Sequence, residues 1–361
     1  VGLVRRVAAA LAAPVTLAGA AHSPSARLGV AAAEPGDSPE DVVRHAGLAL
    51  RHAGGDGGSD RARGAAGEGA GVFDPGLRAA QADLQAAASR LRAALAGEEL
   101  TLHFQPVVEL PAERLHGREA LVRWRQPDGR VLPPAAFLDA AVQAGLGAAV
   151  DRWVLDRACA AAAGWAPGVG VSVNVSAAQF ADPDLVGVVG RAVRQHALDP
   201  ARLTLEITET ALLRRTDWTQ ATLQELRRLG VRLAVDDFGA GYSSLSYLHH
   251  FELDAIKIDR SFVSRLGADR QAEGIVRAIL HLAAALELEV VAEGVERDEQ
   301  LERLLALTPS APVRLHGQGY LFGRPGPDGG GRLGNLPSEV AGGAAVPRPC
   351  RYAERFEQRV V

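Results

Sequence analysis

The chain has 361 residues and lacks methionine altogether, while aromatic residues make up only 5% of it. Its two cysteines, Cys159 and Cys350, are too few for the disulfide framework of a small secreted protein. They suit a reducing compartment, so we expect a cytoplasmic protein. The net charge of −4 gives no basic excess that would indicate binding to a nucleic-acid polymer. The missing methionine at position 1 indicates either a fragment or a chain with a non-Met start.

Long apolar runs are also missing. No segment after the N-terminus approaches the roughly 20 apolar residues that cross a bilayer, so we expect no membrane segment. The N-terminus itself has two interpretations, because Arg5 and Arg6 precede an apolar run to Ala21 that imitates a secretory signal. The competing interpretation, which we favour, is a helix over 4–12 that turns at Pro14 into a short strand.

The next residues predict a small α+β segment. Residues 27–33 are expected to form a strand, and Ser38 and Pro39 are an N-cap and a first helical residue for a helix that ends near residue 52. Residues 53–71 are rich in Gly, Ala, Arg and Asp and are expected to form a flexible loop. Their GGDGG run has no strand before it, so low complexity is favoured over a phosphate-binding loop.

A long helix follows, which we interpret as a linker over 74–97. It begins at Asp74, and Leu77, Leu84 and Leu91 recur every seven residues along it. Three repeats are few for a coiled coil, so packing against the next domain is favoured over a dimer-forming signalling helix.

From residue 98 to 326, strand-like and helix-like segments alternate, which predicts a (β/α)₈ barrel of the TIM type. The expected strands are 101–109, 117–124, 170–175, 203–208, 231–236, 255–259, 289–293 and 313–320. The expected helices are 134–145, 149–163, 184–196, 219–229, 271–287 and 297–307. Residues 327–361 are expected to be a low-complexity tail.

The stretch from Val231 to Leu248 carries the strongest chemical signal. A short apolar run ends there in Asp236 and Asp237, which are followed by a glycine-containing turn. Neighbouring residues of a strand point to opposite sides, so we expect one carboxylate on each side of the backbone. That arrangement is costly unless a cation such as Mg²⁺ or Mn²⁺ lies between them. For an isolated Asp pair, capping of the next helix would be the simpler explanation.

Further polar residues lie at or near other expected strand ends: Glu119, Asn174, Glu206, Lys257, Asp259, Glu293 and Gln318. Each alone has an ordinary structural explanation, such as a helix cap, a turn or a neutralising charge. In a barrel, however, strand ends converge on one mouth, where several carboxylates would raise one another's pKa without a counterion. Ligands that offer only oxygen favour Mg²⁺ or Mn²⁺ over zinc, and two such ions suit attack of water on a phosphodiester.

A family resemblance extends from about residue 100 to 325. The segments that carry it are FQP (104–106), EALVRW (119–124), NVSAAQF (174–180), EITE (206–209), DDFGAGYSSL (236–245), KIDRSFV (257–263), AEGVE (292–296) and QGYLFGRP (318–325). They resemble the EAL family of bacterial cyclic di-GMP phosphodiesterases. The resemblance implies a barrel whose first strand, 101–109, is antiparallel. It also implies hydrolysis of cyclic di-GMP to linear pGpG, which would favour motility over biofilm.

The resemblance also implies roles for single residues. The first metal ion would be held by Glu119, Asn174, Glu206 and Asp236, and the second by Asp236 as a bridge with Asp237 and Glu293. Lys257 would orient the attacking water, and Glu293 is alternatively a general base. Glu209 would steady the loop 237–244, which is linked to metal binding and dimerisation, so a homodimer is expected. The dinucleotide would contact Gln105, Leu121, Arg123, Asp259 and Gln318.

Departures from the family pattern are small. Ala240 stands where many members have Thr, and Phe104 replaces a frequent Tyr. Because all expected metal ligands are present, we favour an active enzyme over a silent EAL module that binds cyclic di-GMP or a protein partner as a receptor. A third alternative is a competent barrel that is held inactive because an upstream sensor is missing.

The N-terminal part of the chain resembles a second family. Residues 27–53, followed by the sequence GVFDP, resemble the last third of a GGDEF diguanylate cyclase domain. This favours the helix and strand over a signal peptide at the N-terminus. The catalytic hairpin of that domain would lie before Val1, so residues 1–73 are expected to be a truncated remnant without cyclase activity.

Overall fold

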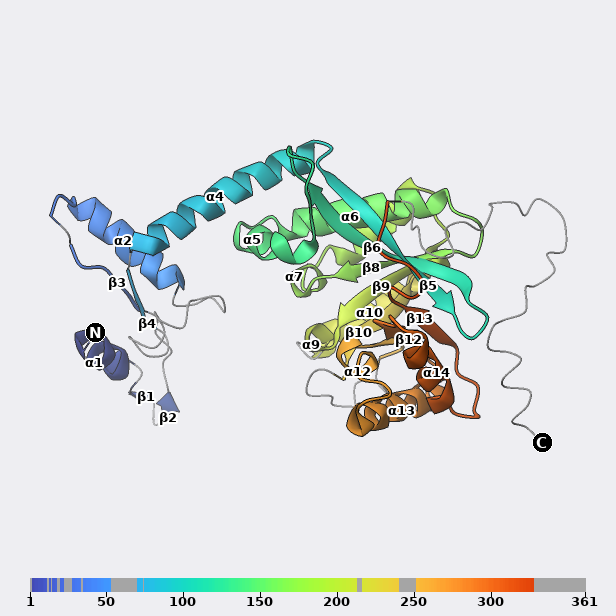
Figure 1. Ribbon diagram of the computed structural model, residues 1–361. Coiled ribbons are helices and arrows are strands. Elements are labelled where there is room, and N and C mark those ends of the chain that lie inside the picture. The colour runs from blue at the N-terminus through green and yellow to red at the C-terminus, as the bar shows by residue number, and fades with distance from the viewer. Residues whose placement is uncertain are drawn as a thin grey trace, which may run out of the picture. The chain divides into compact units, whose positions relative to one another are not determined.

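The computed structural model describes residues 2–11, 13, 15–17, 20–22, 28–33, 35–52, 70–73, 75–212, 216–239 and 251–327. The chain divides into two compact units, Val1–Arg90 and Leu91–Val361 (Figure 1). None of the helices among the described residues is long and apolar enough to cross a membrane.

The first unit contains short strands and helices. Its elements are α1 (Gly2–Leu11), β1 (Val15–Leu17), β2 (Ala20–His22), β3 (Leu28–Val30), α2 (Pro39–His52) and β4 (Ala70–Val72). β1 and β2 form an antiparallel hairpin, and β3 and β4 pair in parallel. Ser38 caps α2 as expected, because its Oγ accepts from the Asp41 N–H at 3.2 Å while Asp41 accepts from the Ser38 N–H at 3.1 Å.

The helix and strand expected at the N-terminus are therefore confirmed as α1 and β1. The loop expected over 53–71 is wrong at its end, since residues 70 and 71 belong to β4, where they pair with β3. Short strands of this kind depend on a partner distant in sequence, which local composition does not reveal. Residues 53–69 lie outside the described part of the chain.

The helix expected over 74–97 is observed as α4 (Pro75–Ala96). Its last two turns belong to the second unit, because Leu91 and Ala94 are buried in that unit's core. Of the three leucines that recur every seven residues, Leu91 is therefore seen to pack against the second unit's core. The side chains of Leu77 and Leu84 lie outside the described residues.

Eight strands of the described residues close into a barrel in the second unit (Figure 1). They are β5 (Leu100–Glu109), β6 (Arg114–Arg125), β8 (Gly170–Val175), β9 (Leu203–Thr208), β10 (Arg232–Phe238), β11 (Ala255–Ile258), β12 (Glu289–Glu293) and β13 (Leu315–Gln318). β5 is antiparallel to both β6 and β13, and the remaining pairs around the barrel are parallel. The predicted TIM-type barrel with an antiparallel first strand is confirmed. β7 (Val131–Leu132) adds to β6 as a short extra strand.

Helices connect these strands. They are η1 (Pro134–Ala136), α5 (Leu138–Gln143), α6 (Gly147–Ala163), α7 (Ala177–Phe180), α8 (Leu185–Gln195), η2 (Pro200–Arg202), α9 (Glu209–Leu212), α10 (Thr216–Arg228), α12 (Arg260–Val263), α13 (Arg270–Ala285) and α14 (Asp298–Leu307). The single helix expected over 134–145 is instead a 3₁₀ turn followed by α5, because Phe137 leaves the helical conformation between them. α7, α9 and α12 were not predicted, since four residues are too short to show a helical period.

The barrel core is built mainly from buried aliphatic side chains, but several polar side chains of the strands are buried as well. Strand residues such as Leu205, Val235 and Ile256 have no exposed surface. Lys257 lies on β11 between Ile256 and Ile258 and is also buried, with 1% of its surface exposed. A buried ammonium group is costly unless charged partners surround it, so this lysine marks a polar site inside the barrel.

Candidate active site

A β-bulge at the end of β10 brings two carboxylates together. Val235 pairs with Ile256 and Phe238 with Ile258, so Asp236 and Asp237 together lie opposite Lys257. Asp237 has a φ of 54°, a left-handed conformation that Asp tolerates better than most residues. Carboxylate oxygens of this pair and of Glu293 lie within 4.8 Å of one another. The expectation of one carboxylate on each side of the backbone is therefore wrong, because the bulge breaks the alternation of the strand.

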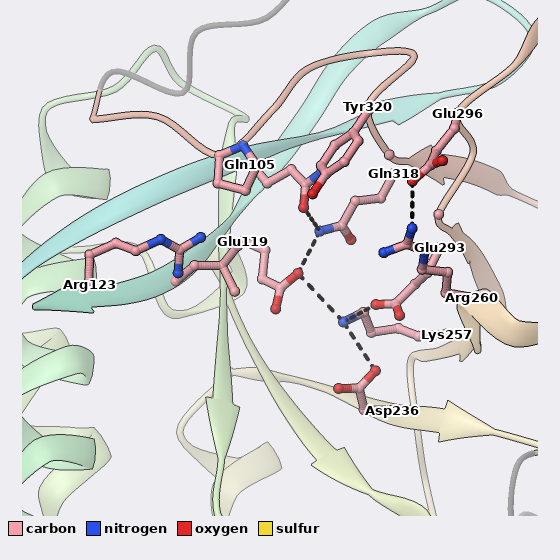
Figure 2. A pocket seen from close by; sticks show the side chains of 14 residues that line it. Gln105, Glu119, Arg123, Asp236, Lys257, Arg260, Glu293, Glu296, Gln318 and Tyr320 are labelled. Carbon is pink, nitrogen blue, oxygen red and sulfur yellow. Dashed lines mark hydrogen bonds and ion pairs between the residues drawn. The ribbon is translucent and has the colours of Figure 1, made fainter. Parts of the chain in front are cut away.

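Lys257 lies at the centre of the site (Figure 2). Its Nζ is 2.6 Å from Glu293 Oε1, 2.7 Å from Glu206 Oε2 and 3.1 Å from Asp236 Oδ1. Glu119 Oε2 is farther away, at 3.8 Å. One ammonium group thus serves four carboxylates, which come from β6, β9, β10 and β12.

Amide side chains extend this network toward β5. The Asn174 amide donates to Glu119 Oε1 at 2.6 Å, and the Gln318 amide donates to Glu119 Oε2 at 2.5 Å. Gln318 also donates to Gln105 Oε1 at 3.2 Å, and Gln105 donates to the Gly323 carbonyl at 3.1 Å. Both oxygens of Glu119 therefore face fixed donors, which orient its carboxylate toward the barrel mouth.

Burial and crowding shift the pKa values at this site. Burial raises the pKa of Glu293 to about 7, the Asp236 and Glu119 charges add to the rise, and Lys257 opposes it. Burial likewise raises the pKa of Glu206 well above its usual range, although Lys257 acts against it. For Lys257, burial lowers the pKa, but the surrounding carboxylates outweigh it and hold the pKa well above the ordinary value. The site therefore carries more negative charge than its one lysine compensates.

The donor set fits divalent cations that prefer oxygen. Asp236, Asp237 and Glu293 place three carboxylates within reach of one ion. Further oxygen atoms beside these three carboxylates come from Glu119 and Glu206. Glu119 accepts a hydrogen bond from Asn174, and Glu206 contacts Lys257, as Asp236 does. Among these residues there is neither histidine nor cysteine, a composition that suits Mg²⁺ or Mn²⁺.

A cleft of about 320 Å³ opens above Lys257. Of the expected substrate contacts, Gln105, Leu121, Arg123 and Gln318 line it, together with Glu119, Asp236 and Glu293. Asp259 does not belong to this lining. Its Oδ1 accepts from the Ser261 N–H at 3.0 Å and caps α12, so its expected contact with the dinucleotide stays a prediction.

Sequence reasoning missed three side chains at the rim of the cleft, Arg260, Glu296 and Tyr320. Arg260 Nη2 is 2.7 Å from Glu296 Oε1, and the two join the turn after β11 to the turn after β12. Gly294 permits the close approach of Arg260 to the turn after β12, because its φ is 72° and a Cβ there would collide with the Arg260 side chain. All three lie inside segments already noted, KIDRSFV, AEGVE and QGYLFGRP, next to residues that had been assigned.

Glu209 begins α9 and is buried, with 4% of its surface exposed. Its expected partner, the loop 237–244, is described only as far as Gly239. The substitution noted at Ala240 and the relation of Glu209 to this loop therefore lie outside the described residues.

Comparison with known proteins agrees with this geometry. The EAL domain profile matches residues 88–325. The bifunctional diguanylate cyclase/cyclic di-GMP phosphodiesterase MucR of Pseudomonas aeruginosa is 41% identical over 241 residues, 66% of this chain and 34% of MucR. The cyclic di-GMP phosphodiesterase NbdA of the same species is 38% identical over 321 residues, 87% of this chain and 39% of NbdA. The chain thus spans well under two thirds of these relatives.

A solved structure of the MucR phosphodiesterase in complex with cyclic di-GMP superimposes with a TM-score of 0.63. It is 40% identical, and the match covers 67% of this chain and 97% of that one. The FimX EAL domain from Pseudomonas aeruginosa bound to cyclic di-GMP gives a TM-score of 0.60 at 29% identity, covering 68% of this chain and 97% of that one. The barrel, the acidic site at its mouth and these matches together show that the chain belongs to the EAL-domain family.

Proposed function

We propose that this chain hydrolyses cyclic di-GMP to linear pGpG with two Mg²⁺ or Mn²⁺ ions. The observation that carries the proposal is the gathering of four carboxylates around one buried lysine at the floor of an open cleft. The names of MucR and NbdA state cyclic di-GMP phosphodiesterase activity, and the solved MucR structure holds this dinucleotide.

The proposed ligands of the first ion are Glu119, Asn174, Glu206 and Asp236. Asp236 also belongs to the second set, with Asp237 and Glu293, which the bulge of β10 brings within 4.8 Å of one another. When bound, the divalent ions supply Lewis-acid activation of water for attack on phosphorus. Their positive charge would also lower the raised carboxyl pKa values, so cation binding is coupled to ionisation of the site.

Lys257 is proposed to orient the attacking water and to offset negative charge on the phosphate. Its pKa lies well above the usual value, so the side chain stays protonated and donates hydrogen bonds rather than accepting a proton. Glu293 has two possible roles, as a metal ligand or as the general base. Its position 2.6 Å from Lys257 Nζ serves either role, because the attacking water would lie near both groups.

Substrate recognition is assigned to the cleft wall. Gln105 and Gln318 are joined by a hydrogen bond of 3.2 Å and present their amides between β5 and β13. Leu121 offers an apolar surface, and Arg123 a guanidinium group that suits a phosphate oxygen. We keep Asp259 as a further contact, because it lies directly before Arg260, a residue of the cleft rim.

The decisive experiment is hydrolysis of cyclic di-GMP with Mg²⁺ or Mn²⁺, followed by chromatography of pGpG. Wild type should turn over, and Glu119→Gln should not, because both of its carboxylate oxygens are held at the site. Glu109→Gln is the matched control, since Glu109 ends β5 and pairs with Arg114. Tight binding without turnover by wild type would instead support the receptor function, and no binding would exclude both functions.

Homodimerisation through the EAL domain is proposed together with a role for Glu209. Buried at the start of α9, Glu209 is proposed to steady the loop 237–244. Glu209→Ala should weaken Mn²⁺ affinity or dimerisation about tenfold, as loss of an outer-shell partner does elsewhere. Titration calorimetry and light scattering would measure the two effects, and normal values for both would contradict this role.

We also propose the domain division 1–73, 74–97, 98–326 and 327–361, with the first part related to the last third of a GGDEF domain. Its support is the strand β3 and the helix α2, which lie within the resembling residues 27–53. Residues 1–73 do not contain the GGDEF sequence of that domain's catalytic hairpin, so they should make no cyclic di-GMP from GTP. Detection of that product by chromatography would contradict the assignment.

A further inference from the structure

A second cluster of ionisable side chains lies at the opposite end of the barrel, where the parallel strands begin. Glu289 is the first residue of β12 and His316 the second residue of β13, whereas Glu293 and Gln318 of the mouth end these strands. His116 lies near the start of β6. We call His116, Glu289 and His316 the basal triad. It takes no part in the proposed hydrolysis.

The triad places two imidazole nitrogens around one carboxylate oxygen. His316 Nε2 is 3.5 Å from Glu289 Oε2, and His116 Nε2 is 3.9 Å from the same oxygen. The two rings lie 4.0 Å apart between centroids and are tilted by 37°. One donor atom from each residue therefore lies within 4.8 Å of the other two.

A β-bulge places His116 in this position. Val107 of β5 pairs with Gly117, and Val108 pairs with Leu115, so His116 is the extra residue of β6 between the two pairs. Such a bulge changes the direction of a side chain that regular pairing would point elsewhere. The mouth uses the same device for Asp236 and Asp237.

His316 supplies the independent sign of a ligand. It is buried, with 3% of its surface exposed, yet neither ring nitrogen makes a hydrogen bond within the described residues. The nearest carboxylate oxygen, Glu289 Oε2, lies 3.5 Å from His316 Nε2, which is longer than an ordinary N–H···O hydrogen bond. A buried polar group without such a partner is destabilising, and a bound ion is one of the few explanations for it.

We propose that the basal triad binds a divalent transition-metal ion of the zinc type. Two imidazoles and one carboxylate are a common ligand set for such ions. With metal–ligand distances of about 2.0–2.2 Å in a tetrahedron, donor atoms lie roughly 3.3–3.6 Å apart. The His316 spacing to Glu289 Oε2, 3.5 Å, lies in this range, and the His116 spacing of 3.9 Å exceeds it by a few tenths of an ångström.

The ion must compete with arginine for the carboxylate. Arg232 Nη2 is 2.5 Å from Glu289 Oε2, the oxygen that the histidines face, and Arg314 Nη1 is 2.7 Å from Oε1. The Arg314 side chain is 71% exposed and can turn into solvent. Arg232 is less exposed, so its displacement sets the affinity, and a modest zinc affinity is expected.

The triad can be reached from solvent on the side of His116, because the His116 side chain is 36% exposed. A cavity of about 270 Å³, lined in part by His116, Arg232 and Glu289, offers an entry path.

The test is Zn²⁺ binding to the full chain in excess Mg²⁺, which under the proposed function occupies the mouth. Wild type should retain one equivalent of zinc by elemental analysis, and Co²⁺ in its place should show visible d–d absorption. His116→Gln and His316→Gln should each lower zinc affinity by at least about tenfold. The matched control is His281→Gln, because His281 is exposed on α13 and should leave zinc binding unchanged. Circular dichroism establishes that each variant is folded.

The arginine provides a second, opposite test. Arg232→Gln removes the competitor for Glu289 Oε2, so zinc should bind more tightly to this variant than to wild type. Zinc binding that is absent from wild type, or equal in wild type and His116→Gln, would overturn the proposal. Because the His116 side chain is 36% exposed, this variant should fold even if His316→Gln does not. None of these measurements depends on phosphodiesterase activity.

Discussion

The two ends of strand β12 carry glutamates with opposite behaviour. Glu289 begins the strand at the barrel base, and its pKa is about 2, whereas Glu293 ends it at the mouth with a pKa of about 7. Burial acts to raise both pKa values. At the base, the neighbouring His316 together with Arg232 and Arg314 outweighs it, while at the mouth one lysine is divided among four carboxylates. The number of compensating cations, rather than burial alone, decides the charge of each site.

This difference gives the two ends different relations to metal ions. The mouth has a surplus of negative charge and only oxygen ligands, so the Mg²⁺ or Mn²⁺ ions proposed there would relieve it. At the base, Glu289 is already compensated by arginine and the other ligands are imidazoles, so the proposed ion of the zinc type would have to enter by exchange. The same eight strands thus support two kinds of site, and substitutions at each end should act in different ways.

The largest effect is expected from Asp236→Asn at the mouth. Asp236 is the proposed bridge between the two ions, and the substitution removes one negative charge while preserving shape. We expect the rate of cyclic di-GMP hydrolysis to fall by more than about 100-fold in saturating Mn²⁺, since even outer-shell substitutions cost 10–100-fold. Initial rates of pGpG formation measure this change.

The control for this prediction is Asp184→Asn. Asp184 precedes α8 and pairs with Arg191 at the surface, so its loss should leave the rate unaltered. A near-normal rate in Asp236→Asn would contradict the bridging role.

The second effect concerns stability and tests the charge surplus directly. Lys257→Met should destabilise the metal-free protein by about 3–5 kcal/mol, because it leaves buried carboxylates without their cation. Saturating Mg²⁺ should then raise the midpoint of thermal unfolding more in Lys257→Met than in wild type. Equal shifts with Mg²⁺ would mean that lysine and metal ions do not compensate the same charges.

Much of this fold could be predicted because its signals are local. Apolar runs of four to seven residues marked the strands, and β8, β9 and β12 match their predicted limits. Side-chain direction could not be predicted where a bulge intervenes, as Asp237 shows, because a bulge depends on the partner strand. The strand β4 was missed for the same reason, since it is defined by pairing with β3.

The two sites differed in how much the sequence revealed. The mouth residues lie at or near the ends of their expected strands, so position along the strand identified Glu206 and Glu293 as candidates. The basal triad was missed because His116, Glu289 and His316 lie at strand beginnings, where polar residues are ordinary. Only the closed barrel brings β6 and β13 to either side of β5 and thereby places the two rings in contact.

A third, smaller effect is expected in the pH dependence of stability. His116 has a lowered pKa of about 4 in the folded protein against about 6.5 when unfolded, so its contribution is complete above pH 6.5 and is lost as the pH falls toward 4. Glu289 adds a further loss between about 4.5 and 2. His116→Gln should therefore flatten the slope of the unfolding free energy between pH 6.5 and 4. Urea unfolding in metal-free buffer measures this slope, and an unchanged slope would contradict the assignment.

The smallest effect is expected at the rim of the cleft, where charges are paired in solvent. The side chains of Arg260 and Glu296 are 59% and 35% exposed, so their ion pair contributes about 0.2–1 kcal/mol at most. Glu296→Gln should barely change the thermal midpoint, but it frees Arg260 beside the proposed dinucleotide site and should alter KM a few-fold with little effect on kcat. Asp128→Asn, which breaks the exposed pair with Arg130 away from the cleft, should change neither. A fall in kcat as large as that of Asp236→Asn would place Glu296 among the groups that act on the reacting phosphate. The assignment of Glu296 to the rim of the cleft rather than to the reacting centre would then be wrong.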